Sequence, residues 1–304
     1  GMSGHDATKK ILSRLLWVMK QNEAGLKADI DSEFLHDFRV SIRRTRSALS
    51  LIKNVFPKDQ TKRAKKEFAT LGKLTNHLRD LDVYLLEKTR YINMLPEALQ
   101  PGLASIFEKL AKERVQEQRK VAKALDQAFY KNLVTWWEEF LHTDRVDGAA
   151  KNANRPVLSL AKEFISKKYN QIIDAGKKIT ETTPDPVLHA LRIECKKLRY
   201  LLEFFASLFP ENEVQFLIKQ LKKLQDNLGE FNDLFVQQES LKAILDGFDN
   251  SGKEQAQRAA AVGGLIAVLH GKQRQVRTQF AETFGHFSSR QNSQLFHQLF
   301  MEKQ

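Results

Sequence analysis

The chain carries one basic stretch twice, and this repeat decides the fold. The first copy reads His36-Asp37-Phe38-Arg39-Val40-Ser41-Ile42-Arg43-Arg44-Thr45-Arg46, and the second, 153 residues later, reads His189-Ala190-Leu191-Arg192-Ile193-Glu194-Cys195-Lys196-Lys197-Leu198-Arg199. The same offset places Phe56-Pro57 on Phe209-Pro210 and Asp80-Leu81 on Asp233-Leu234. About 50 residues therefore align without a gap, and a repeat of this kind predicts two copies of one structural unit.

Each copy fits an amphipathic helix. On a helix that turns about 100° per residue, one face carries His36, Arg39, Arg43 and Arg46, with Arg44 at its flank. The second copy repeats this face with His189, Arg192, Lys196 and Arg199, flanked by Lys197. The opposite side is apolar and reads as the core stripe. Ser32 and Asp185-Pro186 are start signals at matching places, so we expect Ser32 to be an N-cap and both histidines to lie in the first turn.

The positive charge is concentrated in the repeated segments. The chain has 49 Lys and Arg against 37 Asp and Glu, a net charge of +12. Residues 36–79 hold 12 basic and 3 acidic side chains, and residues 189–223 hold 7 and 4, so the two windows account for the whole excess. A cationic excess within folded segments, rather than in a tail, favours a binding site for an anion.

The remaining sequence also reads as helices. No run shows strand-like alternation bounded by hairpin turns, so we predict an all-α protein of two four-helix units related by the repeat. The first repeat is expected over residues 8–142, a polar linker over residues 143–155 and the second repeat over residues 156–302. One continuous helix is expected over 59–93 and another over 212–245. Helical phase places further lysines beside the basic faces: Lys62, Lys66, Lys73, Lys219, Lys222 and Lys223.

Phosphate is the ligand class that this pattern fits best. The Arg guanidinium offers a planar fork of donors to phosphate oxygens, and Lys offers a compact charge. A row of such side chains along a helix suits a repeating anion better than a single small substrate, and a histidine in the first turn adds further donors.

Two other function classes stay open. Nucleic acid also presents phosphates, but single-strand binders interleave aromatic side chains for base stacking, and only Tyr200 lies near the basic faces. A metal-dependent phosphohydrolase could use His36-Asp37, but the second copy has Ala190 in place of Asp37, and the repeated spacing places cations rather than carboxylates. The sequence has neither a nucleophile elbow nor a phosphate loop. We predict no catalytic residue, cofactor or metal site.

The single cysteine and the hydropathy indicate the cellular setting. Cys195 excludes an intramolecular disulfide and falls toward the core side of its helix, where we expect a buried thiol. No apolar run reaches the roughly 18 residues of a membrane span, and the N-terminus lacks a signal-peptide pattern. We therefore expect a cytoplasmic protein without a membrane partner.

These residues resemble the CHAD family, helical domains named for a histidine at the start of such helices. Residues 36–46 look like its first signature, and residues 189–200 with Glu203 and Phe209-Pro210 look like its second. The helices that follow are similar as well, over residues 79–83 and 224–233. One departure is Thr75-Asn76, where a Leu-Gly resembling Leu228-Gly229 is usual, and there we expect a change in the bend of the helix.

The resemblance covers nearly the whole chain and implies a single domain over residues 1–304. Family members consist of two four-helix bundles with pseudo-twofold symmetry and a basic channel between them. They bind inorganic polyphosphate, and some associate with polyphosphate granules. For this sequence, the resemblance implies a channel lined by His36, Arg39, Arg43, Arg46, His189, Arg192, Lys196 and Arg199. Some CHAD domains are fused to a triphosphate tunnel metalloenzyme, but no Glu-x-Glu-x-Lys occurs here. We expect a non-catalytic polyphosphate binder, with RNA or DNA as the second choice.

Overall fold

The computed structural model describes residues 1–143, 150–248 and 252–301, and every regular element in that part of the chain is a helix. The prediction of an all-α protein is confirmed. The helices up to residue 142 are α1 (Gly4–Ala28), α2 (Ser32–Leu51), α3 (Lys58–Leu74), α4 (Asn76–Leu86), α5 (Lys88–Asn93), α6 (Gln100–Leu125) and α7 (Ala128–His142). The later helices are α8 (Val157–Gly176), α9 (Asp185–Phe205), α10 (Glu211–Asp246), α11 (Lys253–Thr278), α12 (Phe280–Phe287) and α13 (Arg290–Phe300). Short 3₁₀ turns cover Glu97–Leu99 and Ala206–Leu208.

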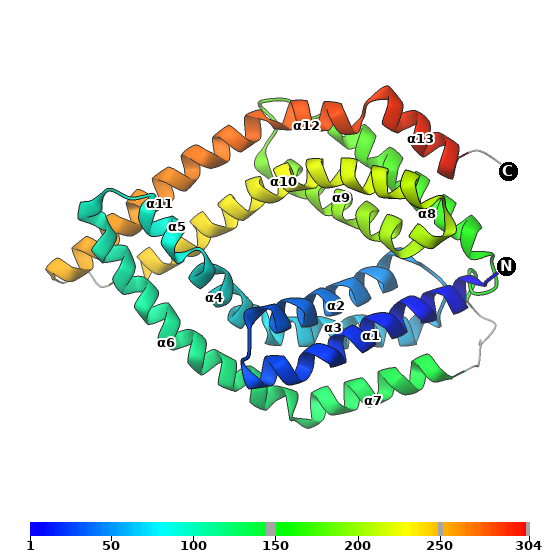
Figure 1. Ribbon diagram of the computed structural model, residues 1–304, viewed down its shortest axis with the longest axis horizontal. Helices are drawn as coiled ribbons and strands as arrows, with labels where there is room; N and C mark the ends of the chain where they lie inside the picture. The colour runs from blue at the N-terminus through cyan, green and yellow to red at the C-terminus, as the bar shows by residue number, and fades with distance from the viewer. Residues whose placement is uncertain (144–149, 249–251, 302–304) are drawn as a thin grey trace.

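The helices form two groups that follow the order of the chain. In Figure 1 the blue-to-green helices α1, α2, α3 and α7 occupy the lower part of the view, and the helices α8, α9, α10, α12 and α13 occupy the upper part. The groups meet at both ends of the long axis, where α1 contacts α8 and α6 contacts α11. The two basic helices, α2 and α9, also contact each other.

Equivalent helices begin at equivalent residues. The starts of α8, α9, α10 and α11 each lie 153 residues after the starts of α1, α2, α3 and α6. This offset is the same as that of the repeated basic stretch. It therefore relates helix starts well beyond the residues that align in sequence. The spacing of helix starts therefore follows the repeat through most of the described chain.

The two basic helices have the predicted amphipathic form, but the N-cap of α2 is not the predicted residue. Asp31, rather than Ser32, caps α2, because its extended backbone lets the side chain accept a hydrogen bond from the Glu33 backbone N at 2.8 Å. The expected cap was therefore one residue late. Each histidine is the fifth residue of its helix, just past the first turn, so its backbone N–H is not among the unpaired donors of the helix end.

The two copies differ at the position where the sequence departs from the family pattern. The predicted helix over 59–93 is wrong as one element, because it is broken at Thr75 and again at Glu87. Thr75 is fully buried with φ −103° and ψ 1°, outside the helical basin. Its hydroxyl donates to the carbonyl of Gly72 at 3.2 Å. The equivalent helix α10 runs unbroken through Gly229, in agreement with the prediction over 212–245.

Apolar faces from both groups enter one buried core. On α2 the predicted core side chains Phe38, Ile42 and Leu49 are buried, and Phe34 is partly buried against the core. Cys195 on α9 is also buried, and burial raises the pKa of its thiol well above the ordinary value. The expectation of a structural, unreactive thiol at this position is met.

The predicted linker is covered only in part, since residues 144–149 lie outside the described residues. The residues that follow are firmly anchored. The Asn152 backbone N donates to the carbonyl of Asn54 at 2.7 Å, and the Asn152 side chain donates to the carbonyl of Lys53 at 2.8 Å. Ser3 and Pro156, themselves 153 residues apart, form an isolated antiparallel bridge. This segment therefore joins the start of α8 to the N-terminus and to the α2–α3 loop.

Candidate anion-binding site

The predicted basic faces of α2 and α9 meet in the folded chain. Arg43 Nε donates to the Tyr200 hydroxyl at 2.9 Å. Arg44 forms an ion pair with Glu203, and its guanidinium lies 5.5 Å and 5.2 Å from the ring centroids of Tyr200 and Phe204. Two segments separated by 153 residues thus supply side chains to one place.

Lys196 lies at the centre of this cationic surface. Its side chain is half-buried. Burial, reinforced by the charges of Arg43, Arg192 and Arg199, lowers the pKa of Lys196 to about 8, against a smaller opposing effect of Asp233. A lysine in water titrates near 10.4. Burial is the larger cause of this lowered pKa, and the three arginines add to it because their positive charges act on the same amine.

The other predicted cations divide into paired and unpaired groups. Arg192 lies 3.4 Å from Asp233, Arg199 lies 3.3 Å from Glu203, and Lys197 lies 2.6 Å from Glu194. The Arg199 Nε lacks hydrogen-bond geometry and is an ion pair only. Across the described ranges, Arg43, Arg46 and Lys196 form no ion pair. These unpaired side chains are the strongest candidates for contacts to an external anion.

Arg39 has a structural role that the sequence did not reveal. Its guanidinium donates to the Gly72 carbonyl at 2.9 Å, to Thr75 Oγ1 at 2.6 Å and to Asn76 Oδ1 at 2.8 Å. These three acceptors all lie at the break between α3 and α4. Arg39 therefore stabilises the broken helix end, and only its remaining donors can serve a ligand.

The two predicted histidines are placed differently. His36 is partly buried, and burial together with the charge of Arg79 lowers its pKa, which favours the neutral imidazole. His189 is exposed, and its Nδ1 hydrogen-bonds to Asn232 Oδ1. The neutral ring of His36 can offer an anion one N–H donor, whereas the Nδ1–H of His189 is already donated to Asn232 Oδ1.

A hollow of about 280 Å³ opens beside the basic helices. Its lining includes Arg43, Arg46 and Lys197, all predicted, together with Lys65 of α3. Lys65 was missed, because residues 62, 63, 65 and 66 are all basic and the sequence does not tell which of them faces α2. The six predicted secondary lysines are exposed on α3 and α10, and none of them lines this hollow: Lys62, Lys66, Lys73, Lys219, Lys222 and Lys223.

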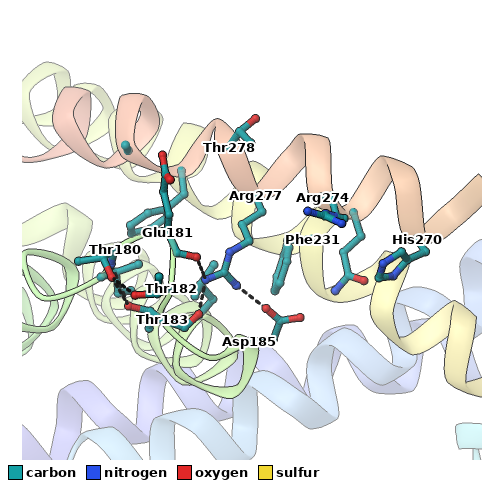
Figure 2. Close-up of a pocket in the computed structure, with 15 residues that line it drawn as sticks. Thr180, Glu181, Thr182, Thr183, Asp185, Phe231, His270, Arg274, Arg277 and Thr278 are labelled. Atoms are coloured by element: carbon teal, nitrogen blue, oxygen red, sulfur yellow. Dashed lines mark hydrogen bonds and ion pairs between the residues drawn. The ribbon is translucent and has the colours of Figure 1, made fainter.

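A much larger cavity lies elsewhere, between the loop after α8 and helices α9 to α12. It encloses about 980 Å³ (Figure 2). Arg277, at its centre, is paired with Asp185 and donates to backbone carbonyls of Glu181 and Thr183. Because acidic and basic side chains are mixed in this lining, the cavity lacks the unbalanced positive charge of the α2–α9 surface. We therefore place the candidate anion site on the α2–α9 surface, beside the smaller hollow.

Comparison with known proteins identifies the family of this chain. The family model of the CHAD domain matches residues 10–242, which include both basic helices. The chain belongs to the CHAD domain family. A comparison with curated proteins gives no match.

Solved CHAD-like structures share the fold at low sequence identity. The crystal structure of the CHAD domain from the plant Ricinus communis is 23% identical, with a TM-score of 0.77, and the match covers 95% of this chain and 92% of that chain. PptA from Streptomyces chartreusis is 13% identical, with a TM-score of 0.71, and the match covers 93% and 99%. At these identities the likeness establishes the architecture of this CHAD domain and nothing about its ligand.

Two further observations describe this CHAD domain. Among its described residues, no group of three or more His, Cys, Asp or Glu side chains is arranged to hold a metal ion. None of the helices within the described ranges is long and apolar enough to cross a membrane.

Proposed function

We propose that this CHAD domain binds inorganic polyphosphate, without transforming it, along the surface formed by α2 and α9. The observation that carries the proposal is the contact between α2 and α9, which brings Arg43 and Lys196, unpaired cations from the two copies of the basic stretch, close enough for the charge of Arg43 to act on Lys196. A linear polyphosphate has closely spaced negative charges and no other recognition group, so a row of cations from two helices matches its chemistry. The primary ligands are His36, Arg39, Arg43, Arg44, Arg46, His189, Arg192, Lys196, Lys197 and Arg199.

The proposal includes a pseudo-twofold axis that relates two helical repeats, residues 8–142 and 156–302, around a basic channel. Contacts between residues 153 positions apart support it, since a residue can touch its own equivalent only near such an axis. The Tyr84 hydroxyl donates to the Gln237 carbonyl at 3.3 Å, and Arg258 donates to Ser105 Oγ at 2.9 Å. The bridge between Ser3 and Pro156 is a third such pair. Arg43 and Lys196 are again separated by this offset.

Nucleic acid is the second candidate, and the state of Tyr200 counts against it. This ring is 3% exposed and, like the ring of Phe204, lies close to the Arg44 guanidinium. A base could not stack on it without displacing Arg44, whereas single-strand binders depend on accessible aromatic faces. The site therefore offers contacts to phosphates rather than to bases.

Calorimetric titration of long-chain polyphosphate tests the function. We expect Arg43→Ala and Lys196→Ala each to weaken binding roughly tenfold, a loss typical of a charge-assisted contact. The exposed Lys131 on α7 provides the control, since Lys131→Ala removes the same charge away from α2 and α9. Circular dichroism of each variant would verify that the helices are intact.

Three outcomes would contradict the proposal. Equal affinity of all variants would reject the α2–α9 surface. Tighter binding of a single-stranded RNA than of polyphosphate would favour the nucleic-acid reading. Release of phosphate on addition of Mg²⁺ or Mn²⁺, lost in His36→Ala, would favour a phosphohydrolase.

A further inference from the structure

A second cationic hollow adjoins the first. It measures about 430 Å³ and shares Ser50, Leu51 and Lys197 with the 280 Å³ hollow described above. It lies where the end of α2, the segment that precedes α8, and α8 itself come together. Its lining contains one acidic side chain, Glu163, and six basic ones: Lys53, Lys151, Arg155, Lys167, Lys168 and Lys197.

Half of these cations have no carboxylate partner. Arg155 pairs with Glu163 at 2.8 Å, and Lys168 and Lys197 share Glu194 at 2.5 Å and 2.6 Å. Lys53, Lys151 and Lys167 form no ion pair with any residue that the structure describes. The lining therefore keeps a surplus of positive charge after its internal pairs are formed.

The backbone fixes two of the unpaired lysines near each other. Asn152 is buried and hydrogen-bonds to the carbonyls of Lys53 and Asn54, which joins the α2–α3 loop to the segment that carries Lys151. Asn54 takes φ 59°, a left-handed conformation that asparagine tolerates better than most residues. Hydrogen bonds of the backbone and of Asn152 thus fix the positions of Lys53 and Lys151 in the lining of this hollow.

The equivalent place on the other repeat is less cationic. At an offset of 153 residues, Ser50 corresponds to Glu203, which pairs with both Arg44 and Arg199. Some cations that line the two hollows are replaced: Lys53 corresponds to Ala206, and Lys65 to Ile218. Others are kept, since Lys167 corresponds to Arg14, whose guanidinium lies over the Trp17 ring at 4.1 Å, and Lys10 stands at the position of Glu163. The helices follow the repeat, but the charges follow it only in part.

We propose that a long polyphosphate chain extends from the Arg43–Lys196 site in one direction only. Its path crosses Lys197 and Ser50 into the hollow of Lys53, Lys151 and Lys167, whereas at the equivalent exit Glu203 stands in place of Ser50 and engages Arg44 and Arg199. This inference rests on the proposed function and adds a second subsite that only a long chain can reach. A chain that is too short would occupy the first site alone.

Two double variants with equal loss of charge test the inference. Lys53→Gln with Lys167→Gln removes two unpaired cations of the second hollow, and Lys10→Gln with Arg14→Gln removes two exposed cations of the first repeat, Arg14 being the equivalent of Lys167. We expect the first pair to weaken the binding of long-chain polyphosphate roughly three- to tenfold, as for the loss of two partly exposed charge contacts. Tripolyphosphate affinity should not change, and the control pair should have little effect on either ligand.

Salt dependence supplies a second readout. If two phosphate contacts are lost, the log–log slope of long-chain binding against salt should become shallower by roughly 1.4, by analogy with single-stranded nucleic acid. An equal effect of both double variants would show a general electrostatic field and overturn the directed path. An equal loss for tripolyphosphate and the long chain would also overturn it. If the wild-type protein bound neither ligand, the proposed function itself would fall, which is a distinct result.

Discussion

At the scale of single residues, Lys196 is the cation of the candidate site whose pKa is lowered toward neutral pH. Burial and three neighbouring arginines lower the pKa of its amine to about 8. An arriving phosphate would reverse this effect, because a nearby negative charge stabilises the ammonium form. Lys196 can therefore report on ligand binding through its protonation.

We expect polyphosphate binding near pH 8 to take up protons, roughly half a proton from Lys196 if its bound pKa returns toward the ordinary value. Affinity should fall as the pH rises through 8, since the free amine then loses its charge. Calorimetry in buffers of different ionisation enthalpy measures the uptake. In Lys196→Arg the uptake should disappear while binding persists, and unchanged uptake would assign the proton to another group.

The same lowered pKa has a consequence for stability without ligand. The folded protein holds fewer protons on Lys196 than the unfolded chain does between about pH 8 and the ordinary value of 10.5. The contribution of this group to the free energy of unfolding therefore increases as the pH rises through that window. Below pH 8 both states are protonated, and the cost of burying the charge is fully present.

At the scale of helices, periodicity predicted the type of each element better than its ends. The amphipathic pattern identified α2 and α9, and the unbroken α10 was also expected. The departure from the family pattern at Thr75-Asn76 indicated a change in the bend there, but the helical period alone predicted one continuous helix. The contact of Thr75 with Arg39 on another helix could not be read from this segment. The pair of Arg44 with Glu203 was missed for the same reason, since its partners are 159 residues apart.

The crossing of α6 and α11 depends on Gly102. A Cβ atom at this position would lie 2.5 Å from the Gln257 carbonyl oxygen, a backbone atom that cannot move aside. We expect Gly102→Ala to lower the free energy of unfolding by about 1–3 kcal/mol, as for other overpacked contacts. Chemical denaturation followed by circular dichroism measures the change.

Gly271 on α11 is the matched control, because among the described residues nothing lies within 4 Å of the position that a Cβ atom would take there. At this site the higher helix propensity of alanine should act alone, so Gly271→Ala should raise the free energy of unfolding by up to about 1 kcal/mol. Changes of the same sign in both variants would show that α6 and α11 do not approach as closely as described.

At the scale of the whole molecule, the ten predicted primary residues come from two segments that the fold brings into contact. Sequence repetition predicted that both segments would be basic helices. It could not predict that Arg43 and Lys196 would influence each other, nor that Lys65 would join them, because the relative placement of the helices is set by the packing of the whole core.

Engagement of many cations predicts a steep response to salt. If some 6–8 of them contact the ligand, the log–log slope of affinity against salt concentration should be on the order of −4 to −6, by analogy with single-stranded nucleic acid. Titrations over a series of salt concentrations would measure it. A flat response would contradict a mechanism based on counterion release.

The contacts between equivalent residues also bear on the symmetry of the ligand. The two ends of a linear polyphosphate are chemically identical, so the molecule reads the same from either end, unlike a nucleic acid strand with its 5′ and 3′ termini. Near Arg43 and Lys196, a binding surface with twofold symmetry would bind such a chain in either orientation with the same contacts. A strand whose two ends differ chemically would run in one direction along the first half of this surface and in the opposite direction along the equivalent second half. The duplicated helices thus favour a polymer that has no direction of its own.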